Sequence, residues 1–339
     1  MKREASIFFH SQKFYFIVIA LALMTIMPLF VSSYVVSEVL TPMLIFAIYA
    51  SSWNLLASSG QGSLGHAAFL GIGGFASALL AIKSGIPPIV SLFLGSLLSA
   101  AIGLLIGLVC VRLKAWFLAM VTFGFSVIIV ALMSEFNAFT GGILGFPTPL
   151  LVPRGFPFYY MTFAFAAISI FLIYLIMKTK LGLAFRAIHQ NELEAKMIGI
   201  NTGKYRLVAF VISTFFAGLA GGLYAQSIRY IQLSIFDPYY SFLPLMMAVI
   251  GGLGTVEGPL VGSAIIVSIE SYLPRIDSFL HGLMGPLFPS VSNVGPPLRM
   301  LSLGLFLLVV VIFAPKGVAP LIKKTYNYLR SSPKEAKRQ

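Results

Sequence analysis

Long apolar runs separated by short polar segments make up most of the chain. A helix needs about 20 mostly apolar residues to cross a membrane. The eighth and ninth such runs are short and rich in glycine, so residues 241–273 are also compatible with one long span or a re-entrant hairpin. The pattern predicts an all-α polytopic membrane protein with about ten transmembrane helices. The runs are Phe14–Val36, Val39–Ala57, Ser63–Ile82, Pro88–Val111, Ala115–Ser134, Phe156–Met177, Leu207–Ile228, Ser241–Thr255, Pro259–Leu273 and Arg299–Ala319.

The composition supports this interpretation. Hydrophobic residues make up 58% of the 339 residues and charged residues only 10%, whereas a soluble domain carries about 25% charged residues. Backbone groups in hydrocarbon must pair within their own segment, and the alternation expected of a barrel strand is absent. The run Phe14–Val36 is longer than the apolar part of a signal peptide and lacks a clear cleavage site, so we expect a retained first span.

The formal net charge of +13 comes from cations at the ends of the apolar runs. Such cations orient a membrane protein rather than bind nucleic acid. Most of the 23 Lys and Arg residues fall in the N-terminal tail, the connection after Val111, the loop Lys178–Arg206 and the C-terminal segment. With ten spans and both termini inside, all four face the cytoplasm. The expected organisation is a cytoplasmic tail (1–13), a transmembrane domain (14–319) and a basic cytoplasmic tail (320–339).

The loop Lys178–Arg206 carries helix signals. Asn191 is typical of an N-cap, and Glu194 follows three residues later, as in a capping box. Gly199 stands where a glycine ends a helix. These residues predict one helix near Leu183–Gln190 and a short one near Glu192–Ile198. Leu193, Met197 and Ile198 give the short helix an apolar side, which requires a partner in a polar loop.

The spacing of small residues predicts close helix packing. Small residues recur four apart in Ser99–Gly107 and at Gly218 and Gly222, a spacing that favours close helix contacts.

The sequence predicts neither a metal site nor a catalytic site. Cys110 is the only cysteine, and His66 has no second ligand at a suitable spacing, so no metal site is expected. No phosphate-binding loop or hydrolase motif occurs, so we expect a protein that is not an enzyme.

Three stretches, in order along the chain, point to one family. They are Trp53–Leu56 with Gly60–Phe69 (GQGSLGHAAF), the loop core Gly182–Asn201 continuing to Ala217–Ala225 (AGLAGGLYA), and Ile250–Pro259 (IGGLGTVEGP). Together they resemble permeases of branched-chain amino acid ABC importers. The Ser-Leu-Gly-His form at 63–66 is similar to the M-type member of the permease pair. Glu194-Ala195-Lys196 departs from the Glu-Ala-Ala pattern of the wider importer class.

The resemblance implies a type II ABC importer-like bundle with a cytoplasmic coupling helix, in the inner membrane. It implies a homologous H-type permease, two cytoplasmic ABC ATPases and an extracytoplasmic binding protein as partners. This chain then binds no cofactor, since ATP and Mg belong to the ATPases. The expected cargo is leucine, isoleucine or valine, with urea, other amino acids or small carboxylates as alternatives within the family. An ion-coupled secondary transporter is the alternative of another class, but it predicts charged or broken-helix sites at mid-membrane, which are almost missing here.

Two sets of functional residues are expected. The ATPase-coupling set is Arg186, Asn191, Glu192, Leu193, Glu194, Met197 and Gly199. The set that lines the passage or its gate is Asn54, Gln61, Ser63, His66, Phe69 and Glu257. For Gln61, Ser63 and His66 the alternative is helix capping and interhelical hydrogen bonding, and for Glu257 it is a solvated structural role.

Overall fold

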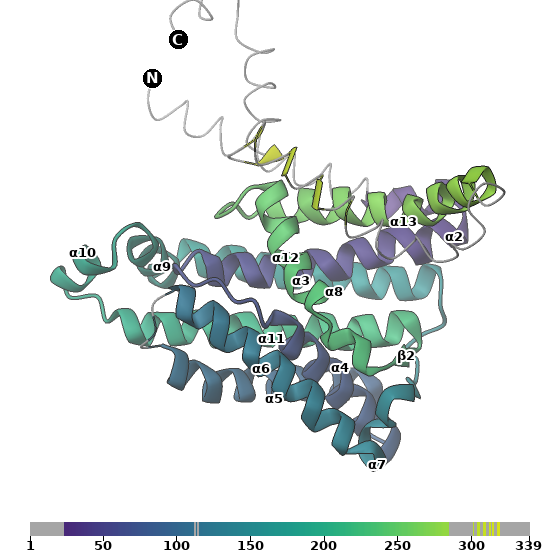
Figure 1. The fold of residues 1–339 in the computed structure, drawn as a ribbon, viewed down its shortest axis with the longest axis horizontal. Coiled ribbons are helices and arrows are strands. Elements are labelled where there is room, and N and C mark those ends of the chain that lie inside the picture. The colour runs from purple at the N-terminus through teal and green to yellow at the C-terminus, as the bar shows by residue number, and fades with distance from the viewer. Residues whose placement is uncertain are drawn as a thin grey trace, which may run out of the picture.

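The structure is a computed structural model that describes residues 24–111, 113 and 115–284, with scattered positions between 301 and 318. The expected tails 1–13 and 320–339, Arg112 and Lys114 lie outside the described residues, as do the first part of the first expected span (residues 14–23) and most of the last one. Figure 1 shows a bundle of long helices that run roughly side by side. The α9–α10 segment lies at one end of the bundle, and α2, α7 and β2 lie toward the other.

Helices account for most of the described chain. The first part contains η1 (Met27–Phe30), α2 (Ser33–Val35), the π-helical η2 (Val36–Leu40), α3 (Thr41–Ala57), α4 (His66–Lys83), α5 (Pro88–Cys110), α6 (Ala115–Glu135), α7 (Asn137–Thr140) and η3 (Gly142–Leu144). The second part contains α8 (Phe156–Lys178), α9 (Lys180–Gln190), α10 (Glu192–Met197), α11 (Thr202–Ile228), η4 (Leu233–Phe236), α12 (Pro238–Gly251) and α13 (Gly258–Met284). Two short strands, β1 (Phe146–Pro147) and β2 (Tyr230–Ile231), pair antiparallel.

Six helices among the described residues are long and apolar enough to cross a membrane. They are Ser33–Ala57, His66–Lys83, Pro88–Cys110, Trp116–Glu135, Phe156–Lys178 and Thr202–Ile228. The chain is therefore a multi-pass membrane protein. The remaining spans of the ten-helix prediction stay a prediction.

The first helix boundary differs from the expectation. Residues 37 and 38 were expected to separate two spans, but Ser33–Ala57 is one continuous helix and the break falls at Val31, before the N-cap Ser32. Pro42 cannot donate a backbone hydrogen bond. Just before it, both the backbone N–H and the hydroxyl of Thr41 donate to the Val36 carbonyl, the hydroxyl at 2.7 Å. The polar Glu38 stays within this helix and pairs with Arg154.

The glycine-rich region forms two helices, which excludes a single long span. The chain turns at residues 252–257, here named the α12–α13 turn, and α12 and α13 pack against each other. α12 has 14 residues, or about 21 Å of helix, less than the roughly 30 Å of a hydrocarbon core. α13 continues to Met284 instead of ending near Leu273.

The core lies around α11, which packs against α3, α4 and α5. The helices α3, α4 and α11 are mostly buried, whereas α6 and α8 are buried much less. Small residues allow the close approach, as the sequence predicted. A β-carbon at Gly73 would lie 2.3 Å from the Cα atom of Gly218, and one at Gly221 would lie 1.8 Å from the Leu70 carbonyl oxygen. The hydroxyl of Ser99 on α5 contacts the carbonyls of Phe69 and Thr214 at 3.0 and 2.9 Å, which ties three helices together.

The close approach of α4 and α11 predicts a contrast between two glycines. Gly221→Ala forces a β-carbon into the Leu70 carbonyl and should lower the free energy of unfolding by about 1–3 kcal/mol. Gly124→Ala on α6 meets no atom within 4 Å and should be neutral or stabilise by roughly 0.5–1 kcal/mol. Titration of the purified chain from mild detergent into SDS measures both. Equal effects of the two substitutions would contradict this account of the packing.

Candidate functional site

The segment that joins α8 to α11 contains the two helices predicted for it. α9 runs Lys180–Gln190, and it starts earlier than the predicted Leu183 because the Thr179 side chain caps it by accepting from the Leu181 backbone N–H at 3.3 Å. α10 runs Glu192–Met197, one residue shorter than predicted. The helix signals read from the sequence are therefore confirmed.

Side chains and backbone at both ends of α10 satisfy its terminal groups. The Asn191 Oδ1 atom accepts from the backbone N–H groups of Leu193 and Glu194 at 3.0 and 3.4 Å, and its Nδ2 donates to Glu194 Oε1 at 2.7 Å. At the other end Gly199 has φ +84°. The N–H groups of Gly199 and Ile200 donate to the carbonyls of Lys196 and Ala195, both at 3.0 Å. This is a Schellman motif, so a six-residue helix is held in one shape.

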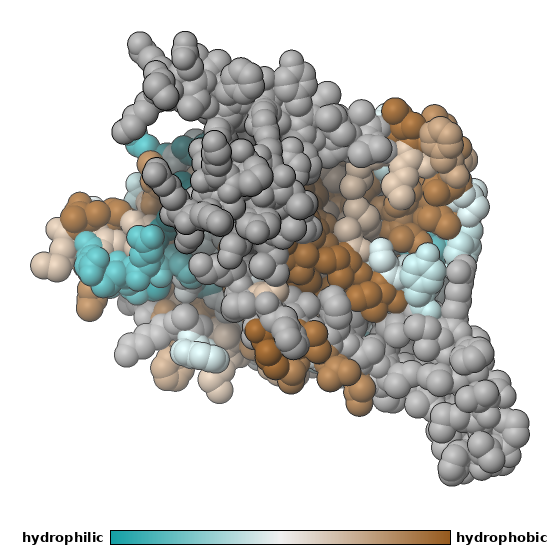
Figure 2. Space-filling model, turned by 90° about the horizontal axis from the view of Figure 1, so that it is seen from above, coloured by the Kyte–Doolittle hydropathy of each residue, from teal (hydrophilic) through white to brown (hydrophobic). Residues whose placement is uncertain are grey.

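α10 exposes three large apolar side chains beside the charged Glu194 and Lys196. Leu193, Met197 and Ile198 are 70%, 86% and 75% exposed, while Ala195 is buried. Leu183 on α9 adds a fourth exposed apolar side chain at this end. Figure 2 shows hydrophobic side chains next to hydrophilic ones at the far left, where α10 lies. A capped helix with such a face in a polar segment is typical of a docking surface.

Glu192 fastens α10 to the start of α11. Its Oε2 atom lies 2.9 Å from Arg206 Nη2, and its Oε1 atom lies 2.8 Å from Lys196 Nζ. Thr202 donates to Oε1 at 3.4 Å. The hydrogen bond from Lys196, helped by the nearby charge of Arg206, lowers the pKa of Glu192 against the opposing effect of partial burial. The carboxylate therefore stays charged at neutral pH. Of the remaining predicted coupling residues, Arg186 donates to the Met177 carbonyl at 3.1 Å and so ties α9 to the end of α8.

Gln61 lies in the α3–α4 loop (residues 58–65) and reaches the same region. Its Nε2 atom donates to Ser59 Oγ and to the Arg206 carbonyl, both at 2.9 Å. A β-carbon at Gly60 would lie 3.5 Å from the Cα atom of His189 at the end of α9, so the loop runs close to this helix. Gln61 is 3% exposed, so in this chain it forms a buried link between the loop and α11.

His66 is fully buried between α3, α4 and α11. Its Nε2 atom lies 3.2 Å from Ser52 Oγ and 3.3 Å from Ser213 Oγ. Both hydroxyls donate to carbonyls, to those of Tyr49 and Ser52 respectively, each at 2.7 Å. Their lone pairs must then accept from Nε2–H, which assigns the proton to Nε2. The Nδ1 atom has no hydrogen-bond partner among the described residues.

Ser63 and Phe69 lie beside this cluster. The Ser63 carbonyl accepts from Trp53 Nε1 at 2.8 Å. The Phe69 ring is fully buried and packs against Phe125 and Phe210. In the single chain these residues hold helices together. Whether they line a passage in an assembled transporter stays a prediction.

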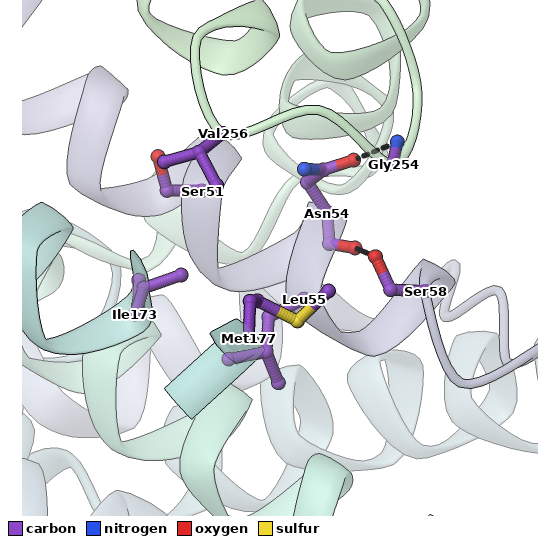
Figure 3. A pocket seen from close by; sticks show the side chains of 8 residues that line it. All are labelled: Ser51, Asn54, Leu55, Ser58, Ile173, Met177, Gly254 and Val256. Carbon is purple, nitrogen blue, oxygen red and sulfur yellow. Dashed lines mark hydrogen bonds between the residues drawn. The ribbon is translucent and has the colours of Figure 1, made fainter. Parts of the chain in front are cut away.

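Asn54 holds the α12–α13 turn against α3. Its Nδ2 atom donates to the Thr255 carbonyl at 2.8 Å, and its Oδ1 accepts from the Gly254 N–H at 2.9 Å. Figure 3 shows this contact at the edge of a small pocket, with Ile173 and Met177 of α8 on the opposite side. The pocket has a volume of about 10 Å³, roughly the room that one water molecule needs. Glu257 is exposed in the turn.

Some residues of the site were missed by the sequence analysis. Arg206 was identified only as one of the cations of the loop, and Ser52, Ser213 and Thr255 were not singled out. Their partners lie far away in the sequence, so no local pattern marks them. Among the described residues no group of three or more His, Cys, Asp or Glu side chains is placed to hold a metal ion.

Known proteins are similar in sequence to this chain over most of its length. The family described as branched-chain amino acid transport system, permease component, matches residues 35–314. The chain is 25% identical over 317 residues to the high-affinity branched-chain amino acid transport system permease protein LivM of Salmonella typhimurium, which covers 84% of this chain and 70% of that protein.

Two further relatives match shorter parts. The high-affinity branched-chain amino acid transport system permease protein LivH of Salmonella typhimurium is 29% identical over 148 residues, or 42% of this chain and 45% of LivH. The guanosine ABC transporter permease protein NupQ of Bacillus subtilis is 29% identical over 136 residues, or 40% of each chain.

The capping of α10 leads to a local prediction. Asn191→Ala removes the acceptor for two backbone N–H groups and should destabilise α10 by about 1 kcal/mol. Hydrogen–deuterium exchange of residues 191–200 should then be roughly fivefold faster, which corresponds to that energy. Leu193→Ala leaves the cap in place and serves as the control. Unchanged exchange in Asn191→Ala would show that the cap does not hold this helix.

Proposed function

Because the chain belongs to the branched-chain amino acid ABC permease family, as an M-type member, we propose that it forms the membrane path of an ATP-driven importer together with an H-type permease. Two cytoplasmic ATPase subunits drive this importer in the inner membrane. An extracytoplasmic binding protein delivers leucine, isoleucine or valine. The chain itself is a permease subunit and not an enzyme.

The observation that carries the proposal is the exposed apolar face of α10. Leu193, Met197 and Ile198 stand outward on a helix that is capped at both ends and fastened through Glu192. A permease subunit that hydrolyses no ATP needs a rigid segment that an ATPase can bind and move. The ATPases dock on this face, and Asn191, Glu194 and Gly199 keep the helix in shape for them.

The path for the substrate lies between this chain and the second permease. The pocket beside Asn54 has a volume of about 10 Å³, too little for a leucine side chain. A passage along an interface opens and closes when the two permeases tilt against each other, so no permanent channel is needed within either one.

The cargo is the least constrained part of the proposal. The LivM and LivH relatives are named for branched-chain amino acids, and this favours leucine, isoleucine or valine. The NupQ relative is named for guanosine, so the shared permease fold accommodates more than one class of substrate. The alternatives of urea, another amino acid or a small carboxylate therefore belong to the same test.

The position of α10 relative to the membrane can be tested directly. In a Cys110→Ser background, which removes the only cysteine, Met197→Cys should react with a membrane-impermeant maleimide only in inside-out vesicles. The cations at this end of the bundle favour the cytoplasmic side. Leu144→Cys, 80% exposed at the opposite end, should react only in right-side-out vesicles. Labelling of Met197→Cys from the outer surface would refute the mechanism.

Placing one charge in the apolar face of α10 tests whether the ATPases dock there. Leu193→Asp should prevent co-purification of the ATPases and lower ATP-driven leucine uptake in proteoliposomes by roughly tenfold or more, the size expected for losing a buried leucine contact. Leu144→Asp makes the same change at the opposite end and should leave ATPase binding intact.

Three results would contradict parts of the proposal. Normal ATPase binding by Leu193→Asp would show that the ATPases do not dock on the apolar face of α10. Uptake driven by an ion gradient without ATP would favour a secondary transporter. Uptake of guanosine or urea but not leucine would overturn the substrate assignment and leave the importer assignment standing.

A further inference from the structure

The Glu192 side chain attaches α10 to the start of α11. Three donors, on Lys196, Thr202 and Arg206, converge on the Glu192 carboxylate. Lys196 belongs to α10 itself, whereas Arg206 and Thr202 belong to α11. The ion pair with Arg206 is the one that crosses from α10 to a long helix of the bundle. Because the Arg206 side chain is only 11% exposed, water screens this pair less than a surface pair.

Arg206 also contacts the α3–α4 loop. While its guanidinium holds Glu192, its backbone carbonyl accepts the hydrogen bond from Gln61 Nε2 at 2.9 Å. The second proton of that amide goes to Ser59 Oγ. Both donors of Gln61 are thus used, and the side chain has one orientation. The α3–α4 loop is thereby joined to the first turns of α11, next to the point where α10 is fastened.

The α3–α4 loop in turn contacts helices far from α10. The Ser63 carbonyl accepts from Trp53 on α3. The Leu64 N–H donates to the Thr122 hydroxyl on α6 at 3.2 Å, and a β-carbon at Gly65 would lie 1.8 Å from the Thr122 carbonyl oxygen. A displacement of this loop therefore cannot stay local, because backbone lies directly against backbone.

We propose that Arg206 and Gln61 are positioning residues that carry a displacement of α10 into the α3–α4 loop and from there into α4 and α6. The inference rests on the proposed function, since it assumes that a motor protein moves α10. It adds the route within this chain: Glu192 to Arg206, Arg206 to Gln61, and Gln61 to the loop. We call this route the Glu192–Arg206–Gln61 linkage.

Lys196 provides the matched control for this linkage. It lies 2.8 Å from the same carboxylate but belongs to α10, so its loss removes a neighbouring charge without cutting the connection to α11. Glu192→Gln keeps the size of the side chain and removes the charge that holds Arg206. Gln61→Met keeps the approximate volume and removes both donors at a position that is 3% exposed, away from any docking surface.

The test uses the whole complex of both permeases, the ATPases and the binding protein in proteoliposomes. Glu192→Gln and Gln61→Met should each keep ATPase co-purification and ATP hydrolysis. Each should lower the melting temperature by only about 2–4 °C, the shift expected for losing about one hydrogen bond. Leucine transported per ATP hydrolysed should fall about tenfold, within the range by which single residues change the coupling between two sites. Lys196→Gln should keep the wild-type ratio. The double variant should be no worse than the more affected single variant, because both changes interrupt one route.

The outcomes separate this inference from the proposed function. If the wild-type complex shows no ATP-driven uptake, the proposed importer function is wrong, and so is the inference about the linkage that rests on it. If the wild type transports and both variants keep its transport-to-ATP ratio, the linkage alone is wrong. Loss of assembly, or a fall in melting temperature of roughly 10 °C or more, in both variants would also overturn it, because the contacts would then support folding instead of carrying movement. An equal loss in Lys196→Gln would point to the local charge and not to the connection with α11.

Discussion

The close contact between α4, α5 and α11 is the constraint on which the rest of the structure depends. In lipid there is no hydrophobic force between helices, since the surroundings are as apolar as the side chains, so helices associate through van der Waals contact and hydrogen bonds. Gly73, Gly218 and Gly221 bring backbone against backbone, and the Ser99 hydroxyl lies between two carbonyls. Every other element is placed relative to this packed centre.

Buried polar groups fix the register in which these helices pack. The shared hydrogen bond from His66 to Ser52 and Ser213 joins α4 to α3 and α11 at one register only, because each hydroxyl has its proton committed to a carbonyl. Asn54 does the same for the α12–α13 turn by pairing with both a backbone donor and a backbone acceptor. Buried polar contacts of this kind are costly to leave unpaired, so they select one arrangement of helices.

The α9–α10 segment is built on a different principle. It lies outside the packed centre, and its shape comes from caps, a Schellman motif and ion pairs. This makes it stiff without making it buried, and it leaves the apolar side chains of α10 available to a partner. A stiff exposed helix joined to a tightly packed bundle is suited to transmit movement, since neither part absorbs a displacement by deforming.

The sequence by itself determined the membrane class, the family likeness, the helices of the α9–α10 segment and the small-residue contacts. These depend on composition or on residues a few positions apart: Asn191 caps a helix whose first turn follows it, and Gly199 ends one that has just finished. It was wrong at residues 37 and 38, which were expected to separate two spans but lie within a continuous helix, where Glu38 pairs with Arg154. Only the tertiary structure decided that Glu192 pairs with Arg206 and which groups Gln61 and His66 contact. The contacts of Gln61 with Arg206 and of His66 with Ser213 join positions 145 and 147 residues apart, and no local pattern encodes which distant groups a folded bundle brings within hydrogen-bond distance.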